Sequence, residues 1–72
     1  MIDKKIFGER LTAARKRMGY THQYLADVLG VSRSMISKYE NGVTLPQMDH
    51  AALLAKTLNV SLDYLMGLKD EE

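Results

Sequence analysis

Apolar residues recur along this 72-residue chain at the spacing of amphipathic helices, and short polar breaks separate the apolar runs. The pattern predicts five helices, which span about residues 4–18, 22–29, 33–40, 46–58 and 62–66. The connections between these segments are short, and the length allows one small domain. The prediction is therefore a compact all-α fold with a single domain over residues 1–72.

Residues suited to helix caps stand at the predicted breaks. A side-chain oxygen at the N-cap accepts a hydrogen bond from an otherwise unpaired backbone N–H, and four residues are placed to do this: Asp3, Thr21, Ser32 and Ser61. Gly30 follows the second helix, where a left-handed residue is least costly as glycine. Pro46 is expected in the first turn of the fourth helix, where its missing N–H costs nothing.

Helical periodicity also predicts which side chains face the core. The expected inner residues are Phe7, Leu11, Ala14 and Met18 in the first helix, and Met48, Ala51, Ala52, Ala55 and Leu58, with Leu54 beside them, in the fourth. Ala26 is a small residue on the inner face of the second helix. It lets the side of the third helix that carries Ile36 approach closely.

The outward face of the third predicted helix carries short or cationic side chains. These are Arg33, Ser34, Ser37 and Lys38. A helix with such a face can enter a DNA major groove and donate hydrogen bonds to base edges and phosphates. Taken alone, the same residues would more simply form the solvent-exposed surface of a soluble helix.

The chain resembles the lambda-repressor-like helix-turn-helix family, also called Cro/CI or Xre type. The resemblance covers about residues 6–67 and rests on Leu25-Ala26, Leu29-Gly30-Val31-Ser32-Arg33, Ile36-Ser37-Lys38-Tyr39-Glu40-Asn41-Gly42, Leu45-Pro46, Leu54-Ala55-Lys56 and Val60-Ser61-Leu62-Asp63-Tyr64-Leu65. It implies a five-helix domain in which the second and third helices form the helix-turn-helix. It also implies binding to double-stranded DNA.

The resemblance implies a set of DNA-contacting residues at both ends of the helix-turn-helix. They are His22, Gln23, Ser32, Arg33, Ser34, Ser37, Lys38 and Asn41. Arg33 suits the O6 and N7 atoms of guanine. Asn41 is expected to contact a phosphate, although an Asn-Gly pair also serves turn formation alone. Residues 43–45 are uncharged where relatives often carry Lys or Arg, which predicts a gentler salt dependence.

His22 stands at the first residue of the second helix, where members of this family usually have Gln. That position commonly meets a phosphate, with help from the helix N-terminus. A histidine can donate a hydrogen bond there, more strongly when it is protonated. The equal alternative is an exposed histidine without a role, with Gln23 taking over part of the contact.

Glu40 ends the third helix, where a negative charge is unfavourable, so it is expected to need a partner. In relatives, an Arg at the position of Arg15 pairs with a Glu at the position of Glu40, and this sequence has both residue types. The resemblance therefore implies a structural ion pair between them. The alternatives are that residues 15–17 simply grip DNA, or that the pair is exposed and worth about 0–1 kcal/mol.

Some apolar residues stand where relatives are usually polar. Tyr24 and Val28 lie four residues apart on the second helix, and Leu53 interrupts the polar side of the fourth. Single exposed apolar residues are ordinary on protein surfaces. The sharper interpretation is a protein contact. For Leu53, with Leu62, Met66 and Leu68 near the C-terminal end, the favoured contact is a homodimer interface.

Composition excludes several classes of function. The net charge is only +1, but the charged residues of 4–17 are Lys or Arg except for Glu9, whereas residues 70–72 are all acidic. The absence of Cys removes disulfide and thiol chemistry and suits a cytoplasmic location. His22 and His50 lack metal-ligand spacing, and no nucleophile–base set appears. We therefore expect no enzyme, no catalytic residue, no metal, no cofactor and no membrane segment.

These observations predict a sequence-specific DNA-binding transcriptional regulator. The expected form is a bacterial or phage repressor that binds a palindromic operator through the major groove as a homodimer. One alternative is an antitoxin-type interaction protein that binds a small protein partner, a toxin, as well as DNA. Another is a DNA-binding fragment of a longer repressor.

Overall fold

A computed structural model describes residues 2–72 of the chain. Its helices are α1 (Lys4–Met18), α2 (His22–Leu29), α3 (Arg33–Glu40), α4 (Met48–Leu58) and α5 (Leu62–Leu65). No strand occurs within these residues, so the predicted all-α fold with five helices is confirmed. None of the described helices is long and apolar enough to cross a membrane.

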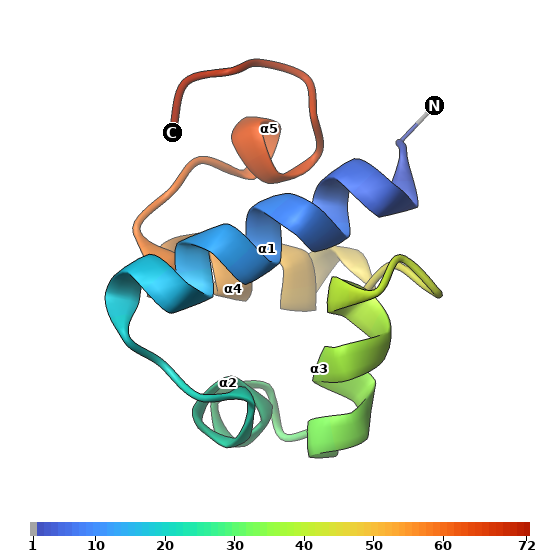
Figure 1. Ribbon diagram of the computed structural model, residues 1–72, viewed down its shortest axis with the longest axis vertical. Helices are drawn as coiled ribbons and strands as arrows, with labels where there is room; N and C mark the ends of the chain where they lie inside the picture. The colour runs from blue at the N-terminus through green and yellow to red at the C-terminus, as the bar shows by residue number, and fades with distance from the viewer. Residues whose placement is uncertain (1) are drawn as a thin grey trace.

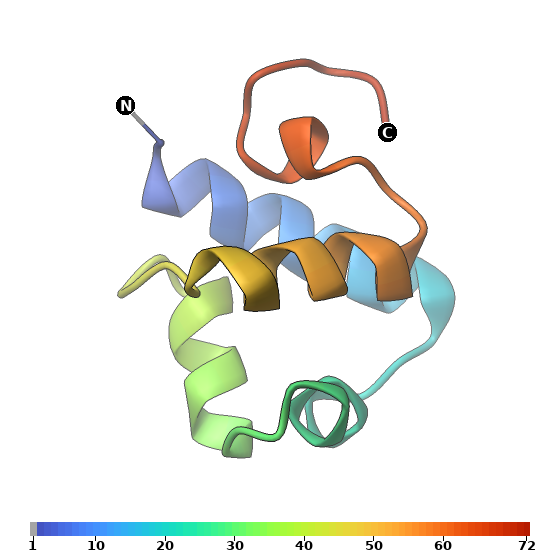
Figure 2. The ribbon, with the colours of Figure 1, turned by 180° about the vertical axis from the view of Figure 1, so that it is seen from behind.

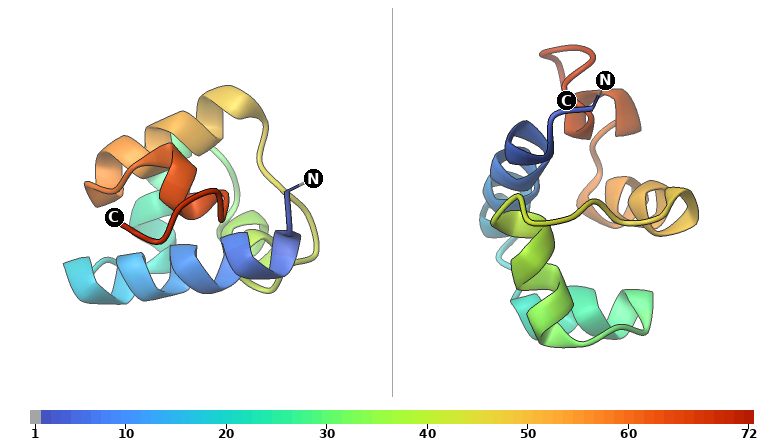
Figure 3. Two further views of the ribbon diagram at one scale, coloured as in Figure 1. Left: turned by 90° about the horizontal axis from the view of Figure 1, so that it is seen from above. Right: turned by 90° about the vertical axis from the view of Figure 1, so that its right-hand side faces the viewer.

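The helices are arranged around α1 and α4, which cross the middle of the molecule (Figures 1 and 2). Helix α5 and the C-terminal segment lie on one side of this pair, whereas α2 and α3 lie on the other. Seen from above, α5 lies between α1 and α4 and packs against both (Figure 3). The helix-turn-helix therefore occupies one end of the molecule, and the C-terminal segment lies at the opposite end.

The helix ends lie where the capping residues predict them. Asp3 accepts two backbone hydrogen bonds at the start of α1. Thr21, Ser32 and Ser61 each accept a bond from the backbone N–H three residues further on. Gly30 is left-handed, with φ of 70°, and ends α2 so that the chain turns directly into the next cap. These local predictions are confirmed.

The core is built from large side chains that every helix contributes. Seven of them are fully buried: Phe7, Leu11, Leu25, Ile36, Leu54, Leu58 and Leu65. Ala26 is also completely buried, as its predicted place between α2 and α3 requires. Because this core extends under α2 and α3, it holds the helix-turn-helix against α1 and α4.

Three expectations about the inner helix faces are wrong. Met48 is 77% exposed and Ala52 is exposed, because the buried face of α4 is centred on Leu54 and Leu58. Each residue turns an α-helix by about 100°, which carries Ala52 out of that face. Met48 lies in the first turn, where the core has ended. Met18 is 38% exposed because it lies in the last turn of α1, which also extends past the core.

The prediction for Pro46 is also wrong in position. Helix α4 begins at Met48 after the N-cap Gln47, so Pro46 precedes the helix rather than forming its first turn. Proline favours an extended conformation in the residue before it, which delays the start of the helix. Pro46 is itself buried, so it packs the α3–α4 connection against the rest of the molecule.

Helix α1 crosses the end of α3 at Gly8. This glycine is buried, and a Cβ atom added to it would lie 2.8 Å from the carbonyl oxygen of Tyr39 and even closer to that of Glu40. Such distances are too short for a side chain without movement of the backbone. Gly8 therefore lets the backbone of α1 rest directly on the C-terminal end of α3.

We expect Gly8→Ala to lower the free energy of unfolding by about 1–3 kcal/mol, because the added methyl group forces the two backbones apart. Chemical denaturation measures this loss. The control is Ala13→Gly at an exposed position of α1, which reports the helix propensity alone at about 0.5–1 kcal/mol. Propensity by itself would make Gly8→Ala stabilising, so a gain in stability would contradict the close crossing.

Candidate nucleic-acid interface

The outer surface of the helix-turn-helix carries most of the residues that the sequence singles out. Four are exposed at the start and along the outer side of α3: Ser32, Arg33, Ser34 and Lys38. Ser37 is half-buried on the same helix. The opposite side of α3 contributes Ile36 and Tyr39 to the core, and burial raises the pKa of the Tyr39 hydroxyl. The structure therefore presents one polar, cationic face of α3 to solvent.

Several of these polar side chains already have partners within the chain. The Ser32 hydroxyl, which caps α3, lies 3.1 Å from the Ser34 hydroxyl. The Gln23 amide donates to the Asp27 carboxylate over 2.8 Å. Asn41 is exposed and follows α3 directly. These contacts lie at the surface, so an incoming ligand can replace them at little cost.

Arg15 and Glu40 lie together between α1 and the end of α3. Arg15 Nε donates to Glu40 Oε2 over 2.6 Å, and its Nη2 donates to Oε1 over 3.2 Å. The third guanidinium nitrogen of Arg15 donates to the Tyr20 carbonyl over 3.0 Å. Only 12% of the Arg15 side chain and 6% of the Glu40 side chain are exposed. The two-bond geometry favours the pair over a flexible surface contact.

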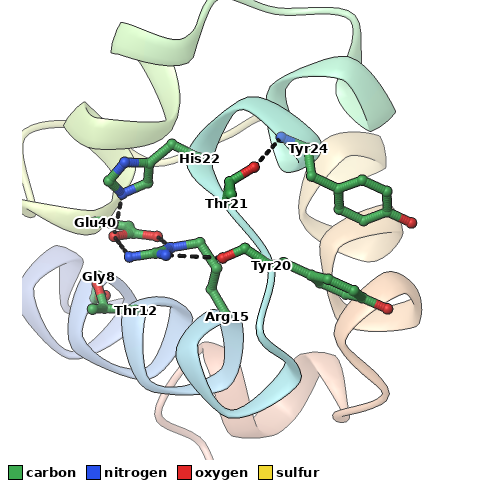
Figure 4. Close-up of polar contacts among 8 residues, drawn as sticks. All are labelled: Gly8, Thr12, Arg15, Tyr20, Thr21, His22, Tyr24 and Glu40. Carbon is green, nitrogen blue, oxygen red and sulfur yellow. Dashed lines mark hydrogen bonds and ion pairs between the residues drawn. The ribbon is translucent and has the colours of Figure 1, made fainter.

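His22 joins this ion pair, which neither sequence-based alternative anticipated. Its Nε2 lies 2.9 Å from Glu40 Oε1, and 34% of the side chain is exposed (Figure 4). An ionised carboxylate can accept about four hydrogen bonds, so the two bonds from Arg15 leave room for a third partner. The unused hydrogen-bonding capacity of a carboxylate was the only feature of the sequence that could have indicated the contact with His22. We call these three residues, Arg15, His22 and Glu40, the Glu40 cluster.

The partners of Glu40 determine its charge state. Burial opposes ionisation, but the hydrogen bonds from Arg15 and His22 and the charge of Arg15 outweigh it and lower the pKa of the Glu40 carboxyl. A carboxylate whose pKa is lower in the folded than in the unfolded chain stabilises the fold above the unfolded value. That contribution is lost as pH falls through the lowered value. The cluster therefore stabilises the protein at neutral pH.

A pocket of about 460 Å³ opens beside the Glu40 cluster. It is lined by Arg15, Tyr20, Thr21, His22, Gln23 and Arg33. Two of these residues are arginines and none is acidic, so the pocket suits an anionic group rather than a cation. Within residues 2–72, no three His, Asp or Glu side chains are grouped so that they could hold a metal ion.

The residues expected at a dimer interface differ in their exposure. Leu53 is 37% exposed and Leu68 is 67% exposed. Leu62 and Met66 are partly buried and pack against the monomer core. Val43 is 60% exposed but was not part of the expected set. The most accessible apolar side chains therefore overlap only in part with those that the sequence singles out.

Residues 11–65 of the chain match the Helix-turn-helix family. The chain belongs to this family, of the Cro/CI and Xre-like type. It is 41% identical over 61 residues to the SPbeta prophage-derived uncharacterized HTH-type transcriptional regulator YonR of Bacillus subtilis. This match covers 85% of this chain and 56% of YonR. It is 38% identical to the uncharacterized HTH-type transcriptional regulator YazB of the same organism, covering 89% of this chain and 93% of YazB.

A solved member of the helix-turn-helix family has a closely similar fold. It is the c2 repressor of Salmonella phage P22 in complex with a synthetic operator. The match has a TM-score of 0.79 and 37% identity, and covers 83% of this chain and 91% of that one. The chain spans about half the length of several curated relatives that it matches. The family resemblance read from the sequence is thereby confirmed.

In this helix-turn-helix chain, we expect Arg15→Met and Glu40→Gln each to lower the free energy of unfolding by about 3–5 kcal/mol. Each substitution removes the oppositely charged partner of a largely buried group, so that Glu40 keeps only His22 and Arg15 keeps only the Tyr20 carbonyl. The double mutant should lose less than the sum of the two single losses, because no charge is then stranded. Denaturant unfolding of all four proteins measures this coupling.

The matched control for the Glu40 cluster is Lys16→Met, which removes an exposed cation from the same turn of α1. It should change the unfolding free energy by less than about 0.5 kcal/mol. Small losses at Arg15 and Glu40 that add up in the double mutant would show that the pair contributes no more than a surface contact.

Proposed function

We propose that this chain is a sequence-specific DNA-binding transcriptional regulator, a bacterial or phage repressor that places α3 in the major groove. The observation that carries the proposal is the exposed polar face of α3, with Arg33, Ser34 and Lys38 at its outer side. The packing of α3 against α1 and α2 supports the proposal, because a groove-binding helix must be held rigidly. The similarity to the operator-bound c2 repressor also supports it.

The side chains divide into two groups in this proposal. Arg33, with Ser34, Ser37 and Lys38, reads base edges from α3. Backbone phosphates are bound by residues at the helix ends: His22, Gln23, Ser32 and Asn41. Phosphate contacts position the protein but carry no sequence information, so the two groups should respond differently to substitution. The proposed function is binding in the cytoplasm and involves no catalytic step.

The proposal includes a homodimer on a palindromic operator. One α3 covers only a few base pairs, too few for useful selectivity, so two copies related by a two-fold axis are required. The exposed Leu53 and Leu68 support a contact between copies. The proposal applies equally to a short regulator and to the DNA-binding part of a longer repressor.

We expect DNA selected by this chain from a random pool to contain two inverted half-sites with centres about 34 Å apart. Sequencing of the selected pool and analytical ultracentrifugation of the complex measure the repeat and the stoichiometry. Two protein chains should bind each selected duplex. One chain on a full selected site would contradict the dimer, whereas a pool without any enriched sequence would contradict the proposed function.

Arg33→Ala should reduce affinity for the selected site and relax the preference at one base pair, at a cost of about 1–3 kcal/mol. Asn41→Ala should weaken all duplexes by similar factors, because it removes only a phosphate contact. Competition binding against single-base variants of the site separates the two effects. Lys69→Ala, an exposed residue that follows α5 and lies outside α2 and α3 in the chain, is the control and should bind normally. Unchanged relative affinities in Arg33→Ala would exclude Arg33 as a base reader.

An antitoxin-type function is the second candidate, and one observation favours it. Val43, Met48 and Leu68 are each at least 60% exposed, which is high for large apolar side chains. Such residues suit contact with a small protein partner. The test is to purify the chain from its native host. Co-purification of one small protein in equal molar amount would favour this candidate.

A further inference from the structure

The contact between His22 and Glu40 has only one possible donor. His22 Nε2 lies 2.9 Å from Glu40 Oε1, and Arg15 donates to both oxygens of the same carboxylate. The lowered pKa of Glu40 keeps this group ionised at neutral pH, and an ionised carboxylate accepts hydrogen bonds without donating any. The hydrogen atom in the contact therefore belongs to His22 Nε2.

This tautomer leaves Nδ1 of the neutral His22 ring as an acceptor. The two nitrogens lie on different edges of the imidazole, and Figure 4 shows the second one turned away from Glu40. No hydrogen bond to Nδ1 is recorded within residues 2–72. A DNA phosphate is also an acceptor, so the neutral ring cannot donate to it from this edge. Only the imidazolium offers a second N–H.

Charged groups face His22 from two neighbouring helices. Arg15 of α1 and Arg33 of α3 line the same pocket as His22 and oppose a further positive charge there. Glu40 of α3 favours that charge through its direct contact. A phosphate placed in the pocket would add negative charge beside the ring and shift this balance toward the imidazolium.

The geometry points to Glu40 as a positioning residue for DNA-backbone binding: it holds His22 by Nε2, so that the ring binds a phosphate only after taking up a proton, and DNA affinity rises as pH falls. This inference rests on the proposed function and adds a pH dependence to it. Histidine is the side chain suited to a change of charge near physiological pH, and the hydrogen bonds to Glu40 lower the pKa of its carboxyl, which favours the ionised form.

The test is fluorescence anisotropy with a selected duplex of about 20 base pairs, between about pH 8 and pH 6 at constant ionic strength. Uptake of one proton allows at most about a tenfold gain in affinity per pH unit, and we expect the wild-type chain to gain several-fold to tenfold overall. His22→Gln should show a flat profile, because glutamine donates without titrating. His50→Gln is the matched control, since it removes the other histidine, and should keep the wild-type profile.

Two further readouts distinguish this role from a structural one. At about pH 6 the wild-type chain makes one more phosphate contact, so the slope of log affinity against log salt should steepen by about 0.9 relative to pH 8. In NMR spectra at about pH 7, addition of the duplex should raise the protonated fraction of the His22 ring. Both measurements use the wild-type chain, so they hold even if Glu40→Gln does not fold. If it folds, its affinity gain should move to lower pH.

The possible results separate the two proposals. Sequence-selective binding with a flat wild-type profile, or an unchanged profile in His22→Gln, would overturn the role of His22 and Glu40 and leave the proposed function standing. Binding without any sequence preference at every pH would overturn the proposed function, and with it the phosphate role of His22.

Discussion

Three helices meet at one carboxylate, and the position of α3 depends on how that carboxylate is satisfied. Glu40 lies at the end of α3, where the helix dipole disfavours a negative charge, and only 6% of its side chain is exposed. A buried charge in such a place is tolerated only with good partners. Arg15 of α1 is one such partner, and His22 of α2 is another. The same carboxylate thus links the first helix to both helices of the helix-turn-helix.

Helix α1 is the support on which both ends of the molecule are assembled. On one side, Gly8 brings its backbone against the end of α3, next to the Glu40 cluster. On the other side, Arg10 donates to the carbonyl oxygens of Tyr64 and Lys69, each over 2.6 Å, and stacks on the Tyr64 ring. These contacts hold α5 and the C-terminal segment. Because α1 makes both sets of contacts, it joins the helix-turn-helix to α5 and the C-terminal segment.

This arrangement gives the proposed interface a packed base and exposed side chains. The buried Ile36 and Tyr39 hold α3 from within, whereas Arg33 and Lys38 are exposed and free to adjust to a groove. His22 differs from these two because one edge of its ring is held by a buried partner. Under the proposed function, His22 contacts both Glu40 and the DNA backbone, so its protonation is coupled to DNA binding.

The amino-acid sequence by itself determined the five helices, their caps except at the start of α4, and the helix-turn-helix, because these features depend on residues within one or two turns of each other. Thr21, Gly30 and Ser32 act as their local chemistry requires. The expected pairing of Arg15 with Glu40 came from family resemblance rather than from spacing. Only the tertiary structure decided that His22 joins them, since the packing of α2 and α3 brings together residues that are 18 positions apart. Packing also decided the exposure of the first turn of α4, because helical periodicity defines a face but not where the core beneath it ends.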